Sequence, residues 1–228
     1  MSDRATKDPH PHLRSFGRRR GRKLSPRQES LLRDLLPRVA VAPKAPLANI
    51  ADAKQIWLEI GFGGGEHLVW QAEKNPGIHL IGCEPFEEGV VKVLTAIEDN
   101  NLSNIAIHPD DAREILPAMP EASLDRIFIL FPDPWPKRKH QKRRLISRSL
   151  LTSLARVMKP GAELRIGTDI PDYARTILMA FQSSPEFTWN SSRPSDWQIR
   201  PPDWPQTRYE QKAVREGRRS CYLFYRRR

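Results

Sequence analysis

The chain has 228 residues, and its 38 Lys and Arg against 27 Asp and Glu give a formal net charge of +11. That length suits one α/β domain, and the excess of positive charge predicts a polyanionic partner. Two cysteines exclude a disulfide-rich scaffold and a four-cysteine zinc site, and no apolar run reaches the ~18 residues of a membrane span.

The first 24 residues predict a flexible basic arm. They carry RSFGRRRGRK at 14–23, with six Arg or Lys and almost no apolar periodicity. They hold no apolar stretch of the kind that opens a secretory signal. We therefore expect a cytoplasmic protein.

Residues 25–53 predict a capping helix followed by a linker. Ser25 as N-cap, Pro26 at the first helical position and Gln28 as capping-box partner begin a short helix that is expected to end at Leu36. The prolines that follow predict a linker along the surface.

From residue 54 to 228, short apolar runs alternate with longer amphipathic segments. Apolar runs without polar alternation, separated by helices, are typical of a parallel sheet covered on both faces. We therefore predict one α/β domain, with a doubly wound, mostly parallel sheet. The predicted strands are 55–60, 78–84, 104–108, 125–131, 162–168 and the run from 221, and the predicted helices are 66–75, 86–99, 111–116, 145–158 and 170–183.

A glycine-rich turn, 61–65, follows the first predicted strand. Glycines permit positive φ and a close approach of a ligand to the backbone. Glu84 ends the next strand, where a carboxylate can accept both hydroxyls of a ribose. After the third strand, Asp110 or Asp111 can accept from an adenine amino group. These positions predict an adenosine-shaped cleft at the carboxyl edge of the sheet.

Glu59, just before the turn, helps to choose among nucleotide ligands. The spacing G-x-G-G-G differs from the G-x-G-x-x-G of dinucleotide sites, and an acid at this point would repel a pyrophosphate. The same acid favours S-adenosylmethionine, whose ammonium and sulfonium groups are cationic. Two alternatives stay open: Glu59 pairs with a helix side chain, and Asp110 or Asp111 is an ordinary N-cap.

The loop FPDPWPKRKHQKRR, at 131–144, follows the fourth predicted strand and brings Asp133 to the cleft. Its prolines restrict the backbone around Asp133 and Trp135, which suits a positioning role. Trp135 either stacks on a base or packs under the loop. No acid occurs between 134 and 160 to pair with the basic run. That run therefore predicts phosphate contacts, with a nucleic acid as methyl acceptor.

The loop also resembles the signature FPDPWxKxRHxKRR of the tRNA (guanine-N7)-methyltransferases. The resemblance continues in RSFxxRxGR at 14–22, LEIGFGxGxH at 58–67, GCEPF at 82–86, GTDIPDYA at 167–174 and TRYEQK at 207–212. It implies the Rossmann-like class I methyltransferase fold with seven strands, S-adenosylmethionine as methyl donor and no metal. The acceptor that it implies is a guanosine in the variable loop of tRNA, at position 46.

Residue by residue, the resemblance implies three groups of site residues, with Asp133 as the active-site residue. The S-adenosylmethionine site would comprise Glu59, Gly61, Gly63, Glu84, Asp111 and Asp133. The substrate guanosine would contact Lys137, Asp169, Thr207, Arg208, Tyr209 and Glu210. The remaining RNA would contact Lys139, His140, Gln141, Lys142, Arg143 and Arg144.

Guanine N7 has an available lone pair, so no proton has to leave before it attacks a methyl group. In-line placement is therefore expected to matter more than a strong base. We expect Asp133 and Asp169 to hold the N1 and N2 hydrogens of guanine and to offset the charge that methylation adds. Asp169 has an alternative role as N-cap of the helix beginning at Pro171.

Two other functions stay open at this point. The Pro-Asp-Pro-Trp loop resembles the Asn-Pro-Pro-Tyr type of loop, which would favour methylation of an amino group on adenine or protein. RNA binding without catalysis would also account for the charge. The sequence does not distinguish a monomer from a homodimer.

Overall fold

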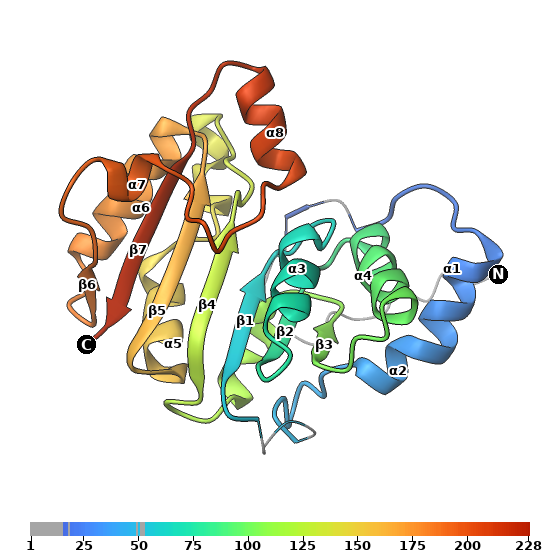
Figure 1. Ribbon diagram of the computed structural model, residues 1–228. Helices are drawn as coiled ribbons and strands as arrows, with labels where there is room; N and C mark the ends of the chain where they lie inside the picture. Colours follow the sequence, from blue (N-terminus) through green and yellow to red (C-terminus); the bar gives the residue numbers. More distant parts are fainter. Residues whose placement is uncertain (1–15, 18, 49, 51–52) are drawn as a thin grey trace.

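A seven-stranded sheet forms the centre of the computed structural model, which describes residues 16–17, 19–48, 50 and 53–228 (Figure 1). The strand order is β3-β2-β1-β4-β5-β7-β6, with β1 to β5 parallel and β7 antiparallel to both β5 and β6. The predicted doubly wound, mostly parallel sheet is thus confirmed. The strands are β1 (Ile56–Ile60), β2 (His79–Cys83), β3 (Ile105–His108), β4 (Leu124–Leu130), β5 (Met158–Thr168), β6 (Phe187–Trp189) and β7 (Cys221–Arg227).

Helices cover both faces of the sheet, because each face presents a separate apolar cluster. One face packs against the π-helix η1 (Leu31–Leu35), α2 (Leu36–Val39), α3 (Glu66–Lys74) and α4 (Glu87–Asp99), and α1 (Pro26–Ser30) leads into η1. The other packs against the 3₁₀ turns η2 (Ala112–Glu114) and η3 (Leu116–Ala118) and against α5 (Arg148–Val157) and α6 (Pro171–Gln182). The remaining helices are η4 (Arg138–Arg143), α7 (Ser195–Gln198) and α8 (Arg208–Arg215).

Side-chain alternation along β1 decides which residues face which layer. Leu58 and Ile60 pack in the cluster under α5 and α6, whereas Trp57 packs in the cluster under α3 and α4. Because successive side chains of a strand point to opposite faces, Glu59 shares the α3 face with Trp57.

The segment between α7 and α8, residues 199–207, crosses the sheet on the α3 face and brings α8 above the carboxyl ends of the strands (Figure 1). We call this segment the strap. Trp204 lies in it and is buried between His67 of α3 and Tyr222 of β7. The strap therefore joins two parts of the chain that lie far apart in sequence.

The helix after Ser25 begins as predicted but ends later. Ser25 and Gln28 form the predicted capping box. The helix then continues past Leu36 to Val39, through a wider π turn in which the Leu36 N–H donates to the Leu31 carbonyl. The wider turn accommodates Pro37, which has no N–H to donate and a ring that clashes in a regular helix.

Two other elements also differ from prediction. The predicted helix 111–116 is two 3₁₀ turns, η2 and η3, and β5 begins at Met158 rather than at 162. No element was predicted between 183 and 221, where β6, α7 and α8 lie. Within the described part of the chain, no helix combines the length and the apolar character needed to cross a bilayer.

Candidate active site

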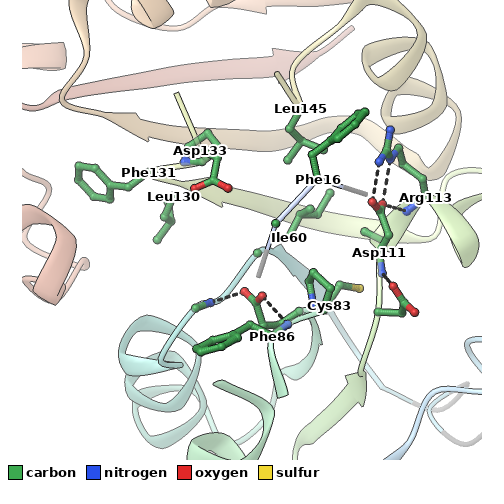
Figure 2. A pocket seen from close by; sticks show the side chains of 18 of the residues that line it. Phe16, Ile60, Cys83, Phe86, Asp111, Arg113, Leu130, Phe131, Asp133 and Leu145 are labelled. Atoms are coloured by element: carbon green, nitrogen blue, oxygen red, sulfur yellow. Dashed lines mark hydrogen bonds and ion pairs between the residues drawn. The ribbon is translucent and has the colours of Figure 1, made fainter. Parts of the chain in front are cut away.

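A cavity of about 380 Å³ lies at the carboxyl edge of the sheet, where the predicted cleft was expected (Figure 2). This volume lies in the range of small-molecule sites. The walls come from the ends of β1 to β4, from the arm and from α8. They include the predicted residues Gly61, Gly63, Glu84, Asp111, Asp133, Arg143 and Tyr209, together with Asp110 and Trp135.

The glycine turn and Glu84 form one wall. Gly61 and Gly63 have φ of 75° and 57°, in the left-handed region that favours glycine. The Gly63 N–H donates to Glu84 Oε2 at 2.7 Å, and the Phe86 N–H donates to Oε1 at 2.9 Å. Burial raises the pKa of Glu84, and these two backbone donors offset part of that rise. The carboxylate is thus fixed in direction and keeps lone pairs for further donors.

Two adjacent acids form the wall opposite the turn. Asp111 accepts a bidentate contact from Arg113, with Nε–Oδ1 at 2.9 Å and Nη2–Oδ2 at 2.6 Å. Burial alone would raise the pKa of Asp111, but the hydrogen bonds and charge of Arg113 lower it overall. Asp111 also caps η2, as one alternative predicted, by accepting from the Arg113 N–H. Asp110 instead binds Arg19 of the arm through two contacts of 2.9 Å.

The described part of the arm, predicted to be flexible, lies across the rim of the cavity. Phe16 and Gly17 line the cavity, and Figure 2 shows the Phe16 ring beside Leu145. The Arg19 carbonyl accepts from the Glu87 N–H at 2.9 Å. No role was predicted for Phe16 from the sequence, although it belongs to the RSF motif.

Asp133 points toward the cavity from a strained loop (Figure 2). Phe131 and Trp135, on either side of it, have φ of 50° and 43°, which non-glycine residues rarely adopt. Such strain persists only where surrounding contacts impose it, here including the Phe131 N–H bond to the Gly167 carbonyl at 2.7 Å. Although the side chain opens into the cavity, the surrounding protein desolvates the Asp133 carboxyl and raises its pKa.

Trp135 packs within the loop and also lines the cavity. Its ring meets Phe16 edge to face at 6.2 Å between centroids. The Arg143 guanidinium lies 4.9 Å from the Trp135 centroid and 4.8 Å from that of Phe16. The Trp135 ring thus packs against the arm and the basic run, and stacking on a base stays a prediction.

Arg144 departs from the predicted group of RNA contacts. Its side chain is 3% exposed, and its Nε donates to the Pro134 carbonyl at 2.9 Å. The guanidinium also pairs with Asp172 and lies over the Tyr173 ring. Because the Arg144 guanidinium makes these contacts within the protein, it stabilises the loop that carries Asp133 and is not available to a phosphate. Three lysines of this segment are exposed: Lys137, Lys139 and Lys142. The other predicted RNA contacts, His140, Gln141 and Arg143, are half-buried.

Most of the predicted substrate contacts lie around α8, outside the cavity wall. Thr207 is the N-cap of α8, and its hydroxyl accepts from the Glu210 N–H at 3.3 Å. Arg208 Nε lies 3.3 Å from Glu66 Oε1, so it spans the glycine turn. Tyr209 alone of this group reaches the cavity, beside Gly63.

Glu210 and Asp169 are held by arginines. Glu210 is 4% exposed, lies 3.3 Å from Arg200 and accepts from the Tyr222 hydroxyl. Asp169 binds Arg218 Nε at 2.6 Å. It does not cap α6, because the N-cap is Ile170 and no side chain caps that helix.

Glu59 is not among the residues that line the cavity, and its predicted contact with the cofactor stays a prediction. Its side chain is buried on the α3 face, where Oε2 lies 2.7 Å from His67 Nδ1. The alternative noted from the sequence, a pairing with a helix residue, is what the structure shows. The reason is the alternation along β1, which turns residue 59 away from the edge that Ile60 and Gly61 form.

The described residues contain no group of three or more His, Cys, Asp or Glu side chains arranged to hold a metal ion. Four carboxylates line the cavity instead, and two of them, Asp110 and Asp111, are paired with Arg19 and Arg113. Glu84, Asp110, Asp111 and Asp133 suit a ligand that carries hydroxyl and amino donors and a positive charge.

Comparison of the sequence identifies its relatives. Residues 53–223 match a family model described as a putative methyltransferase. The tRNA (guanine-N(7)-)-methyltransferase of Rhodospirillum rubrum is 43% identical over 241 residues, covering 100% of this chain and 91% of the relative. That of Hyphomonas neptunium is 48% identical over 206 residues, covering 89% and 94%, and that of Zymomonas mobilis is 42% identical over 230 residues, covering 100% of each.

Solved structures share the fold at much lower identity. The 16S rRNA methyltransferase KamB superposes with a TM-score of 0.56 at 15% identity, covering 77% of this chain and 89% of that one. The [4+2]-cyclase SpnF gives 0.52 at 16% identity, covering 86% and 79%. Because these neighbours include a cyclase, the likeness supports the class I methyltransferase fold and no particular reaction.

Proposed function

Because the chain belongs to the tRNA (guanine-N(7)-)-methyltransferase family, we propose that it transfers a methyl group from S-adenosylmethionine to N7 of a guanosine in tRNA. The observation that carries the proposal is one cavity in which Glu84, Asp111 and Asp133 converge beside the glycine turn. We further propose position 46 of the variable loop as the acceptor, and the cytoplasm as the site of action.

The methyl donor would lie along the carboxyl edge of β1 to β4. Glu84, with both oxygens oriented by backbone N–H groups, would accept the two ribose hydroxyls. Asp111 would accept from the adenine amino group, with Asp110 as its neighbour on the same wall. When bound, S-adenosylmethionine supplies a methyl group on a positively charged sulfur. The carboxylate-rich cavity fits that charge.

The acceptor base would enter beside Asp133. Asp133 would hold the N1 and N2 hydrogens of guanine together with Asp169, leaving the N7 lone pair in line with the methyl carbon. Partial desolvation raises the pKa of Asp133, and an ionised Asp133 with less water around it would interact more strongly with a cationic group. Lys137 and the segment from Thr207 to Glu210 would hold the nucleotide from the two sides.

RNA would lie across exposed basic residues at the rim. Lys139 and Lys142 are exposed in η4, with His140, Gln141 and Arg143 beside them. These groups are suited to phosphate contacts, which position the substrate without reading its sequence. Arg144 would act from below, by holding the loop that carries Asp133.

The test is to incubate the protein with methyl-labelled S-adenosylmethionine and an unmodified tRNA transcript, and then to identify the labelled nucleoside. The expected product is 7-methylguanosine, absent when Asp133→Ala protein is used. Label in methyladenosine or in protein would favour the amino-group alternative. Binding of tRNA with no label would favour a non-catalytic RNA-binding protein.

A further inference from the structure

Two side chains hold the buried carboxylate of Glu210 in the first turn of α8. The Tyr222 hydroxyl of β7 donates to Glu210 Oε1. The Arg200 Nε of the strap lies 3.3 Å from the same oxygen. Glu210 is 4% exposed, so both contacts are made where little water competes for the carboxylate. We call these three side chains, Arg200, Glu210 and Tyr222, the Glu210 cluster.

The two oxygens of Glu210 differ in their partners. Oε1 accepts from Tyr222 and Arg200, whereas Oε2 is buried and has no hydrogen-bond partner among the described residues. A buried carboxylate oxygen without a donor is costly, so a donor that reaches it gains more than the same donor would gain in water. Oε2 is therefore the oxygen of Glu210 that is left for a substrate group.

Further contacts fix the two donors and the backbone that carries Glu210. Arg200 Nη1 donates to the Trp204 carbonyl at 2.7 Å, and the Tyr222 ring meets that of Trp204 edge to face, 5.4 Å between centroids. The Glu210 N–H donates to the Thr207 hydroxyl at 3.3 Å. The direction of the carboxylate is thus set by the fold of the strap, α8 and β7 together, before a substrate is bound.

Tyr222 acts only as a donor to Glu210. Burial, and after it the hydrogen bond to Glu210, raise the pKa of Tyr222 above its ordinary value of 10.0. The phenol therefore stays protonated at the pH of an assay, and its one hydrogen is given to Oε1.

From these contacts we propose that Tyr222 and Arg200 are positioning residues that act through Glu210 on the substrate guanosine. They hold Oε1, so that Oε2 meets a donor group of the guanosine and N7 is kept in line with the methyl group. The proposal rests on the function proposed above, in which the segment from Thr207 to Glu210 holds the nucleotide. Misalignment slows the methyl transfer itself. It leaves the affinity for tRNA, which phosphate contacts dominate, largely unchanged.

Tyr222→Phe tests the proposal, because it removes one hydroxyl and keeps the ring against Trp204. The single-turnover rate at saturating tRNA and cofactor is expected to fall about tenfold, the effect of losing one hydrogen bond to a charged group. The dissociation constants of tRNA and S-adenosylhomocysteine are expected to stay within about twofold of wild type, since neither Tyr222 nor Arg200 lines the cavity.

Arg200→Met removes the second donor and is expected to slow the same step. Arg200 is partly exposed, so it could also contact a phosphate. Measuring the rate at saturating tRNA excludes that contribution.

Tyr225→Phe is the matched control, because it removes the same hydroxyl group from the same strand. Tyr225 stacks on Phe181 in the apolar cluster on the opposite face of the sheet. Assayed at the same interval below its Tm, this variant is expected to keep the wild-type rate. A slow Tyr222→Phe protein is then not explained by lost stability of β7.

Glu210→Ala shows whether Tyr222 acts through Glu210. This variant is itself expected to be slow, and it has no carboxylate for Tyr222 to hold. Adding Tyr222→Phe should therefore slow it by less than about twofold further. If Tyr222 served only the packing of β7, its loss would add in full to that of Glu210→Ala.

The proposal is overturned if Tyr222→Phe is as fast as Tyr225→Phe, or if the two losses add in the double variant. It is also overturned if Glu210→Ala keeps the wild-type rate, or if Tyr222→Phe weakens binding of S-adenosylhomocysteine by about tenfold. The labelled nucleoside formed by the wild-type protein is identified separately. Failure of the proposed function, with no 7-methylguanosine formed, is thus distinguished from failure of the Glu210 cluster.

Discussion

Replacing Glu84 by Gln is expected to weaken binding of S-adenosylmethionine about 30-fold. The Glu84 carboxylate is held in place by the N–H groups of Gly63 and Phe86, at 2.7 and 2.9 Å, and so points its free lone pairs at the ribose position. A glutamine at position 84 has one oxygen and one NH2 group, so its NH2 must face either a backbone N–H or a ribose hydroxyl. One charge-assisted hydrogen bond to the carboxylate is therefore lost.

The loss of one such bond costs about 2 kcal/mol, which corresponds to a factor of about 30 in affinity. Calorimetric titration with S-adenosylhomocysteine measures it, and tRNA binding without cofactor serves as the internal reference that should not change. Glu88→Gln is the matched control, because Glu88 lies close by in α4, pairs with Lys92 and does not line the cavity. An unchanged dissociation constant for Glu84→Gln would refute the assignment of Glu84 to the ribose.

The same carboxyl predicts a pH dependence. Burial raises the pKa of Glu84 above its ordinary value of 4.5, and only the ionised form accepts from both hydroxyls. Cofactor affinity should therefore fall as pH is lowered through that raised pKa, and the fall should be absent in Glu84→Gln.

Three further predictions concern the loop and the RNA. Asp133→Ala should lower kcat about 100-fold with little change in cofactor affinity, and equal losses in both would contradict a positioning role. Arg144→Met removes the charged donor to the Pro134 carbonyl, which should lower the free energy of unfolding by about 2 kcal/mol and Tm by about 6 °C. Arg138 is exposed, so the control Arg138→Met should leave Tm unchanged. Binding of tRNA should weaken steeply as salt is raised. Replacing Lys139 or Lys142 by Gln should each reduce the slope of log affinity against log salt concentration by about 0.9, if each lysine contacts one phosphate. An affinity that does not change with salt would count against phosphate contacts.

The fold could be predicted because its strands are apolar runs between amphipathic helices. Ser25 marks the start of a helix, and the glycine turn and the acids Glu84 and Asp110 mark the ends of strands. α8 was missed although Thr207 and Glu210 have the spacing of a capping box, whereas the other two missed elements carry little local signal. β6 has three residues and α7 has four, so tertiary packing rather than sequence pattern decides them. The π turn before Pro37 was missed for a similar reason, since only the packed helix accommodates that proline.

The wall of the cavity was largely predictable, because the carboxyl ends of parallel strands meet at one edge. Two of the predicted site residues make contacts within the protein that depend on how the chain packs rather than on local sequence pattern. Glu59 turns to His67, and Arg144 turns to Pro134 and Asp172. A basic run indicates where RNA could bind, but it does not indicate which of its guanidinium groups is used to hold the loop.

The central claim, attack by N7 of a tRNA guanosine in the Asp133 cavity, can be tested at a single atom. A tRNA carrying 7-deazaguanosine at position 46 lacks the N7 lone pair and keeps the N1 and N2 hydrogens. This tRNA is expected to bind as tightly as the unmodified tRNA and to receive no methyl group from labelled S-adenosylmethionine. Methylation of the 7-deazaguanosine tRNA at the same rate as the unmodified tRNA would contradict the account.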